Sequence, residues 1–301
     1  MHVTIAICTW NRAKLLRRTL ERMTALAPPR ASWQLLVVNN ASTDETDQVL
    51  EEFGTRLPLR RIWEAVPGLS NARNAAVAAA EGDYIIWTDD DVLVDARWLS
   101  AYEEAFSLRA EADFFGGPVS PWFEGTPPAW LTEAWAFVSS AYAARELGDQ
   151  PFPFTHEVVP YGANYAVRLD VQRRHRYDPA LGRVGTGTLS GEEVGVLRAI
   201  LKERGSGWWV PGARVEHFIP AARQTVSFIR KYYAGIGEQA ARADIAAPSA
   251  TWFGRPRWVW RQAIQRELAW RSSRAAGGPA RSWAADLVAA AIAQGRLRVS
   301  R

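Results

Sequence analysis

The sequence is poor in cysteine and contains no long apolar run. Its single cysteine among 301 residues, Cys8, leaves no intramolecular disulfide and no Cys-x-x-Cys metal or redox motif. No window approaches the ~20 apolar residues that a membrane-spanning helix needs. The first residues lack a basic segment followed by a long apolar stretch, so we expect no secretory signal. Together these absences predict a cytoplasmic protein of a reducing compartment.

Two glycine-rich phosphate-binding motifs are also missing. No Gly-x-Gly-x-x-Gly follows the first predicted strand, so dinucleotide binding in the Rossmann manner is unsupported. No Gly-x-x-x-x-Gly-Lys-Ser/Thr occurs either, which excludes the P-loop ATPases and kinases. If this chain binds phosphates, a metal ion and arginine side chains would have to balance their charge.

The composition is that of a globular protein, with 48% hydrophobic and 23% charged residues. At about 150 residues per domain, the length predicts one or two domains. The charge is unevenly placed, because residues 251–301 hold ten arginines and two acids, for a net charge of +8. The rest of the chain has 26 basic and 30 acidic side chains, for a net charge of −4. A basic segment on a mildly acidic body indicates an anionic surface as partner.

The basic segment is also rich in tryptophan, on predicted helices. These residues are Trp252, Trp258, Trp260, Trp270 and Trp283. Amphipathic helices of this composition often lie in the membrane interface, and we expect docking on the inner face of a membrane. The alternative is a helical cap that packs its tryptophans on the rest of the protein. An acidic body without a known binding module argues against a nucleic-acid partner.

Short apolar runs alternate with helix-period segments over the first 118 residues. Strands are predicted at residues 3–9, 35–38, 59–63 and 84–88. A Ser-x-x-Glu capping box at Ser42 and Glu45 predicts the start of a helix that runs to Gly54. Asp95 is expected to cap a further helix at 97–107. Strands separated by helices make βαβ units, so the sequence predicts an α/β fold with a mostly parallel, Rossmann-like central sheet flanked by helices.

The pattern is less regular beyond residue 118. Helices are expected near 130–147 and at 192–203, and short strands at 164–167, 208–210 and 215–218. After Gln224 the chain is predicted to form helices, interrupted near Pro248 and at 277–279. We therefore expect one domain in two halves, 1–118 and 119–240, followed by a helical C-terminal extension at 241–301.

Polar residues gather at four predicted strand ends, where open parallel sheets bind their ligands. These segments are 9–12, 39–42, 70–74 and 89–91. The sharpest is the triple aspartate Asp89-Asp90-Asp91, which directly follows an apolar strand. An acidic run is usually a solvated turn, but three adjacent carboxylates repel at a sheet edge, and a divalent cation would relieve that repulsion. Oxygen ligands suit Mg²⁺ or Mn²⁺, which typically bridge to substrate phosphates.

The ordered motifs T-W-N-R, V-V-N-N-A-S-T-D, G-L-S-N-A-R-N and W-T-D-D-D-V resemble those of the family 2 glycosyltransferases, which share the glycosyltransferase-A fold. The resemblance covers residues 3 to about 120 strongly and continues more thinly to about 240. It implies a metal-dependent enzyme that moves a sugar from a nucleoside-diphosphate sugar to a hydroxyl acceptor, either a glycan or a lipid-linked saccharide. The first half of the domain would then bind the donor and the second half the acceptor.

The resemblance also implies roles for individual residues. Thr9 would contact the base or ribose, Arg73 would line the nucleotide pocket, and Asp89 would face the ribose. Asn39 stands where many relatives have an aspartate that binds uracil, so it leaves the identity of the base open. Asp91 and His217 would bind the metal, Mn²⁺ or Mg²⁺. Asn11, Arg12 and Asp90 complete the expected nucleotide-sugar-binding set.

Two acids open the helix predicted at 192–203. Paired glutamates in a first turn can simply complement the helix dipole. Family 2 relatives, however, carry acids at this position, and an inverting transfer needs a general base. The resemblance therefore favours Glu193 as the base, with Glu192 as the second choice.

The Pro- and Trp-rich stretch after residue 118 has two interpretations. Its aromatic residues Trp122, Phe123, Trp130 and Trp135 could stack on acceptor sugars or form core. Two alternative functions also remain at this point, a nucleotidyltransferase of similar fold and a non-catalytic carbohydrate- or partner-binding protein. The first would normally show a glycine-rich loop with a basic residue after the first strand, which residues 9–12 do not supply.

Overall fold

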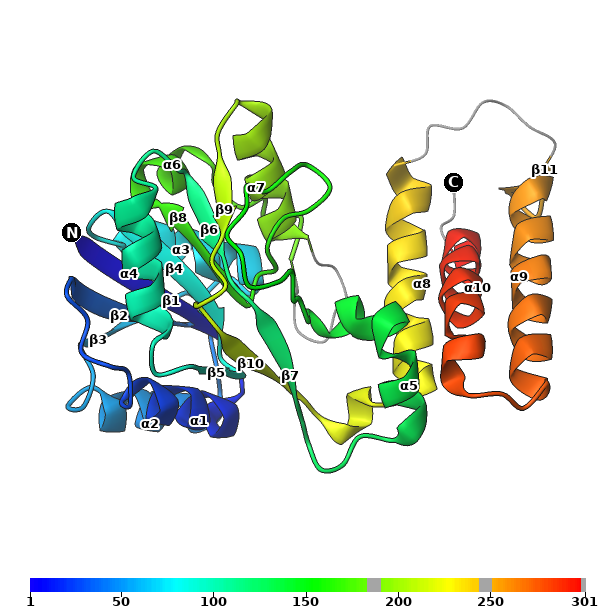
Figure 1. Ribbon diagram of the computed structural model, residues 1–301, viewed down its shortest axis with the longest axis horizontal. Coiled ribbons are helices and arrows are strands. Elements are labelled where there is room, and N and C mark those ends of the chain that lie inside the picture. Colours follow the sequence, from blue (N-terminus) through cyan, green and yellow to red (C-terminus); the bar gives the residue numbers. More distant parts are fainter. Residues whose placement is uncertain (183–190, 244–250, 299–301) are drawn as a thin grey trace. The chain divides into compact units, whose positions relative to one another are not determined.

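The computed structural model describes residues 1–182, 191–243 and 251–298 (Figure 1). Its contacts divide the chain into two compact units. The first unit comprises Met1–Pro121 and Ala143–Phe218, and the second comprises Trp122–Tyr142 and Ile219–Arg301. This grouping differs from the boundaries expected after residues 118 and 240, because residues 219–240 belong with the C-terminal helices.

The first unit is built on a seven-stranded sheet with the order β3-β2-β1-β4-β8-β6-β9. Its strands are β1 (His2–Thr9), β2 (Ser32–Asn39), β3 (Leu59–Trp63), β4 (Tyr84–Asp89), β6 (Phe114–Gly116), β8 (Asn164–Arg168) and β9 (Gly207–Trp209). The first four strands are parallel, as predicted, and β6 and β9 are parallel to each other. Only β8 runs antiparallel to its neighbours, β4 and β6. The predicted mostly parallel α/β sheet is confirmed.

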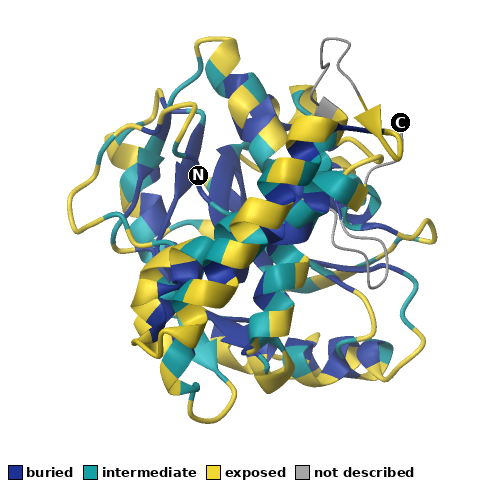
Figure 2. Ribbon diagram, turned by 90° about the vertical axis from the view of Figure 1, so that its right-hand side faces the viewer, coloured by how far each residue is buried: buried dark blue, intermediate teal, exposed yellow. Residues whose placement is uncertain are grey.

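Helices cover both faces of this sheet, because side chains alternate along each strand. Val3, Ile5 and Ile7 of β1 belong to one apolar core, together with residues of α1 (Ala13–Met23), α2 (Thr46–Phe53) and α4 (Trp98–Leu108). Ala6 belongs to the other, together with residues of α3 (Leu69–Ala79), α6 (Leu169–Arg174) and α7 (Glu192–Lys202). The central strands β1 and β4 are largely buried, whereas the edge strand β3 has no buried residue. Figure 2 shows buried strands together with helices that alternate between buried and exposed residues.

A smaller sheet with the order β5-β10-β7 lies beyond the end of β4. Its strands are β5 (Val92–Val94), β7 (Val119–Phe123) and β10 (Val215–Ile219). In the antiparallel pairing of β10 with β5, His217 faces Val92. The amide of Phe218 donates to the carbonyl of Asp91 at 2.9 Å. A segment more than 120 residues away in sequence is thereby held against the triple aspartate.

Two predictions about local structure were wrong. The capping box does not form, because α2 begins at Thr46 with Glu45 as its N-cap. The hydroxyl of Ser42 instead accepts a hydrogen bond from the backbone amide of Asn11 at 3.0 Å. Asp44 instead accepts from the amide of Thr46, where α2 begins, at 3.1 Å. The helix expected near 130–147 is shorter: α5 (Ala129–Val138) is followed by a 3₁₀ turn, η1 (Ser139–Tyr142).

The second unit consists mainly of helices. Besides α5 and η1 it contains η2 (Ala221–Arg223), α8 (Val226–Ala243), α9 (Arg257–Ala275), η3 (Ala280–Ser282), α10 (Ala284–Arg298) and the short strands β11 (Thr251–Trp252) and β12 (Arg255–Pro256). The break predicted at 277–279 separates α9 from η3 and α10, whereas Pro248 lies outside the described residues. Within the described residues, no helix is both long and apolar enough to cross a membrane.

Aromatic residues form much of the core of the second unit. Trp270 and Trp283 are buried in it, and Phe123, Trp130 and Trp135 pack against it from the α5 region. Trp252 and Trp258 are exposed. Trp270 and Trp283 of the basic segment therefore pack inside the protein, whereas Trp252 and Trp258 do not. Phe123, Trp130 and Trp135 of the Pro- and Trp-rich stretch contribute to the same core.

Helices α8 and α10 pack so closely that no side chain fits between them at two positions. A Cβ added to Gly295 would lie 1.9 Å from the carbonyl oxygen of Ala234, and one added to Gly237 would lie 2.0 Å from that of Ile292. Because both obstacles are backbone atoms, a change of side-chain rotamer cannot relieve either overlap.

We expect Gly295→Ala to separate α8 from α10 and lower the free energy of unfolding by about 1–3 kcal/mol, the usual cost of overpacking. Gly195→Ala is the matched control, because Gly195 lies in α7 with no atom near its Cβ position. This control should gain about 0.5–1 kcal/mol from helix propensity. Chemical denaturation measures both, and a stabilised Gly295→Ala variant would contradict the close packing.

Candidate active site

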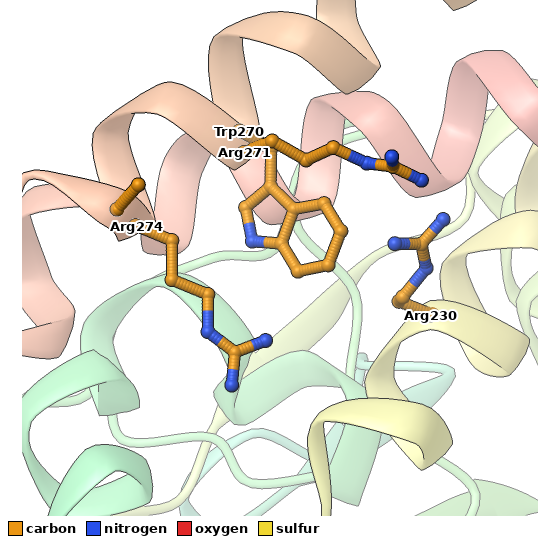
Figure 3. A pocket seen from close by; sticks show the side chains of 5 residues that line it. Arg230, Trp270, Arg271 and Arg274 are labelled. Carbon is orange, nitrogen blue, oxygen red and sulfur yellow. The ribbon is translucent and has the colours of Figure 1, made fainter.

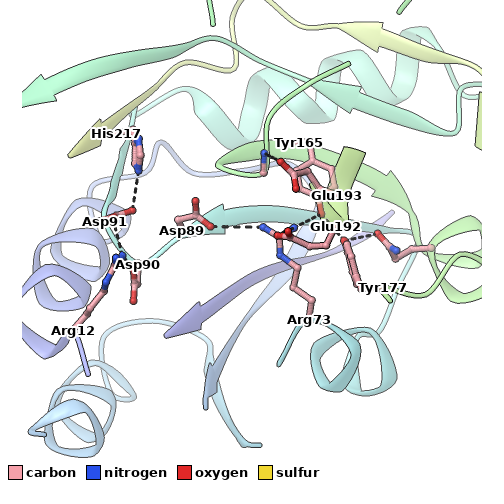
Figure 4. Close-up of polar contacts among 12 residues, drawn as sticks. Arg12, Arg73, Asp89, Asp90, Asp91, Tyr165, Tyr177, Glu192, Glu193 and His217 are labelled. Atoms are coloured by element: carbon pink, nitrogen blue, oxygen red, sulfur yellow. Dashed lines mark hydrogen bonds and ion pairs between the residues drawn. The ribbon is translucent and has the colours of Figure 1, made fainter. Parts of the chain in front are cut away.

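The three adjacent aspartates at the end of β4 point in different directions (Figure 4). Asp90 is buried, where it accepts hydrogen bonds from Thr9 at 2.8 Å and from Arg12 at 2.9 Å. Asp89 points toward Arg73, and Asp91 toward His217. Asp90 thus fixes the loop after β1, while its two neighbours contact other side chains.

Asp89, Asp91 and His217 form a group that fits a divalent cation. One ligand atom from each lies within 4.8 Å of the others. His217 Nε2 is 3.3 Å from Asp91 Oδ1, and Arg12 Nη1 is 2.8 Å from Asp91 Oδ2. The arginine orients the carboxylate from its other oxygen, as second-layer partners of metal ligands usually do. The structure thus places both expected metal ligands, Asp91 and His217, together and adds Asp89 to them.

Arg73 lies at the centre of the site and is only 3% exposed. Its guanidinium is 3.2 Å from Glu192 and 3.9 Å from Asp89. It donates to the hydroxyl of Tyr165 at 3.3 Å, and the rings of Trp87, Tyr165 and Tyr177 lie 5.4–5.8 Å from its central carbon. Buried ion pairs and aromatic faces together offset the cost of removing this charge from water.

The two glutamates at the start of α7 differ in their surroundings. Glu192 is buried and paired with Arg73, and its Oε2 has no hydrogen-bond partner among the described residues. Glu193 is partly exposed and accepts the amide of Gly162 at 3.2 Å. A Cβ on Gly162 would lie 2.9 Å from Arg73 and 3.3 Å from the Glu193 carboxylate, so a side chain here would require both groups to shift. Burial, and next the charge of Glu192, raises the pKa of Glu193 above its usual range.

Three expected nucleotide ligands hold loops in the structure. The carbonyl oxygen of the Asn11 side chain accepts the amides of Thr43 and Asp44, at 2.7 and 3.3 Å. Asn39 is 0% exposed, donates to Asp47 at 2.7 Å and accepts the Ser42 amide at 2.9 Å. Thr9 is buried against Asp90.

Sequence reasoning missed several residues that build the site. The side chain of Asn40 donates to the carbonyls of Glu64 and Val66 and accepts the amide of Gly68. It thereby fixes the turn that precedes α3, the helix that carries Arg73. Tyr165 and Tyr177, which hydrogen-bond to each other, form two walls of the Arg73 pocket. The available signals were the polar segment 39–42, which contains Asn40, and the hydroxyl of Tyr165 in an otherwise apolar strand.

The fold and the site can now be compared with known proteins. The profile described as "Glycosyl transferase family 2" matches residues 4–159, about half of the chain. The architecture is that of a glycosyltransferase-A enzyme. The chain belongs to glycosyltransferase family 2.

Similar sequences include the succinoglycan biosynthesis protein ExoM of Rhizobium meliloti, which is 28% identical over 77% of this chain and 71% of its own length. The poly(ribitol-phosphate) beta-N-acetylglucosaminyltransferase TarS of Staphylococcus aureus is 26% identical over 33% of this chain and 18% of its own length. The chain therefore spans less than a fifth of TarS by sequence.

Among solved structures, the mannosyltransferase PcManGT of Pyrobaculum calidifontis, in complex with GDP-Man and Mn²⁺, matches with a TM-score of 0.58. It is 19% identical, and the match covers 97% of this chain and 86% of that protein. TarS 1-349 in complex with UDP-GlcNAc matches with a TM-score of 0.55 at 15% identity, over 91% and 73% of the two chains. These likenesses establish the fold.

The raised pKa of Glu193 predicts a pH-dependent stability difference. The folded state disfavours the ionised carboxyl of Glu193, which lowers the free energy of unfolding once this group ionises. This loss of stability is absent below the unfolded-state pKa of about 4.3 and develops as pH rises through the folded-state pKa. We expect Glu193→Gln to be more stable than wild type at pH 7 and equal to it near pH 4. Denaturant unfolding across this range measures the difference. Glu104→Gln, at an exposed position, is the control, and its stability relative to wild type should not change in this way with pH. A Glu193→Gln variant that is less stable than wild type at pH 7 would contradict the raised pKa of Glu193.

Proposed function

We propose that this glycosyltransferase moves a sugar from a nucleoside-diphosphate sugar to a hydroxyl acceptor with inversion and with the help of a divalent metal ion. The observation that carries the proposal is the joining of two carboxylates by one guanidinium. Arg73 lies between Asp89, a member of the cation group, and Glu192, the neighbour of Glu193. A metal-binding edge and a candidate base are thereby held in one constellation.

Asp89, Asp91 and His217 would hold the metal ion. When bound, the ion would neutralise charge on the donor diphosphate. One nitrogen and two carboxylate ligands favour Mn²⁺ over Mg²⁺, which binds oxygen ligands almost exclusively. Arg73 would stabilise negative charge on the departing nucleoside diphosphate, because its fixed, buried position requires no reorganisation during the reaction.

Glu193 would act as the general base toward the acceptor hydroxyl. Its raised pKa makes it a stronger proton acceptor than an ordinary glutamate, and its partial exposure lets an acceptor reach it. Glu192 would instead be a positioning residue, because it is buried against Arg73.

The acceptor would be a glycan or a lipid-linked saccharide, reached by docking of residues 251–301 on an anionic membrane surface from the cytoplasmic side. Exposed apolar side chains in this segment support the docking. Phe253, between β11 and β12, is 94% exposed, and Trp252 beside it is 52% exposed. Aromatic side chains at such positions insert readily into a lipid interface.

Asp91→Ala is expected to abolish transfer and to remove the metal-dependent part of nucleotide binding. Calorimetric titration of UDP and GDP, with and without Mn²⁺, measures the binding, and hydrolysis of a panel of nucleotide sugars measures the activity. Asp95→Ala, an aspartate outside the cation group, is the control. Unchanged Mn²⁺-dependent binding by Asp91→Ala would refute the metal assignment.

Glu193→Gln is expected to lower the transfer rate by about 10²–10⁴-fold, the usual contribution of a general base, while nucleotide binding stays intact. Product formation with a hydroxyl acceptor and the same titration separate the two effects. Near wild-type turnover of Glu193→Gln would show that another group takes the proton.

A further inference from the structure

The second unit contains a basic hollow that the donor site does not use. Its volume is about 570 Å³, within the range of ligand sites. Arg230 of α8 and the last turns of α9, with Trp270, Arg271 and Arg274, line it (Figure 3). All of these residues belong to the second unit.

The positive charge of this hollow is only partly balanced. Arg230 and Arg271 share a single carboxylate, Glu267, with nitrogen–oxygen distances of 2.9 Å to each. Arg274 forms no ion pair with any residue that the structure describes. Three guanidiniums against one carboxylate leave a net charge of +2. The C-terminus of α9 contributes about −0.5 at most, so the hollow stays positive.

The indole of Trp270 holds two of these arginines in place. The guanidinium carbon of Arg230 is 4.4 Å from the centre of its ring, and that of Arg274 is 5.7 Å from it. Arg274 also lies 5.5 Å from the ring of Trp283. Side chains ordered in this way lose little further entropy when they bind an anion.

Hydrogen-bond donors also exceed acceptors around the hollow. The Nε1 of Trp270 is buried and has no acceptor among the described residues. Each guanidinium offers five N–H donors, and among the residues that the structure describes only Glu267 supplies a charged acceptor. An anion with several oxygens is the ligand that such a cluster lacks. The fork of a guanidinium matches the tetrahedral oxygens of phosphate.

We propose that this hollow, the Arg–Trp pocket of Arg230, Trp270, Arg271 and Arg274, binds a phosphate group carried by a lipid headgroup or by a soluble compound. Its surroundings fit a lipid source as well as a soluble one. Ile264 and Leu268 of α9 are 54% and 61% exposed. Leu268 follows Ile264 by four residues, and Arg271 follows Leu268 by three, so the three side chains lie on one face of the helix. This face of α9 thus places apolar side chains beside the pocket.

The first experiment uses inorganic pyrophosphate as the probe, with the full chain in EDTA at constant ionic strength. Calorimetric titration should show binding that Arg274→Gln and Arg271→Gln each weaken about tenfold, since each removes a charge-assisted contact. Arg266→Gln, an exposed arginine of the same helix outside the pocket, is the matched control and should change the Kd less than twofold. Thermal unfolding checks that each variant is folded, and Arg271 is the safer position because its side chain is 70% exposed.

An Asp91→Ala background separates this proposal from the donor site. Pyrophosphate binding that persists there, in EDTA, and that Arg274→Gln still weakens belongs to the Arg–Trp pocket even if the enzyme proves inactive. Absence of pyrophosphate binding, or equal losses in Arg274→Gln and Arg266→Gln, would overturn the proposal, because the second result indicates general charge attraction.

Vesicles distinguish the two sources of phosphate. Phosphatidylcholine vesicles with phosphatidic acid, which has a terminal phosphate, are compared with phosphatidylglycerol vesicles of equal surface charge. Preferential sedimentation with phosphatidic acid, reversed by pyrophosphate and weakened in Arg274→Gln, supports a headgroup. Pyrophosphate binding without this preference supports a soluble phosphate compound.

Discussion

One buried guanidinium, that of Arg73, holds together the candidate active site of the first unit. Arg73 lies between Asp89, at the end of a central strand, and Glu192, at the start of α7, and three aromatic rings surround it. Glu192 is buried, so removal of Arg73 would leave an unpaired carboxylate in the interior, which is costly. The position of α7, and hence of Glu193, therefore depends on the helix that carries Arg73.

The sequence predicted that Arg73 and the aspartates lie together, because the geometry of parallel sheets requires it, whereas the roles of Glu192 and Glu193 came from the family resemblance. Strands that run the same way bring their carboxyl ends to one edge, so Asp89, Asp91 and Arg73 converge although they lie on different elements. The pairing of His217 with the acids came only from the family resemblance, since a histidine in a short strand has no sequence signal that tells which strand it pairs with.

Other features could not be predicted, for physical reasons. An asparagine after a strand can bind a ligand or its own loop, and only the three-dimensional path of the backbone decides which. Asn39 and Asn11 use their amides on neighbouring backbone, and Asn40 does the same for the turn before α3. Ser42 illustrates the same competition, because its hydroxyl accepts the backbone amide of Asn11 and does not cap a helix. The division into two units was equally hidden, since aromatic residues near 122–142 suit a sugar site and a core alike.

Gly162 offers a simple criterion for classifying related sequences. Its missing side chain leaves room for Arg73 and lets its amide bind Glu193. A homologue with a larger residue at the equivalent place would have to shift one or both of these groups, even with every acidic motif intact. Such a chain would be a candidate for a pseudoenzyme, or for a transferase that positions its proton acceptor from another element.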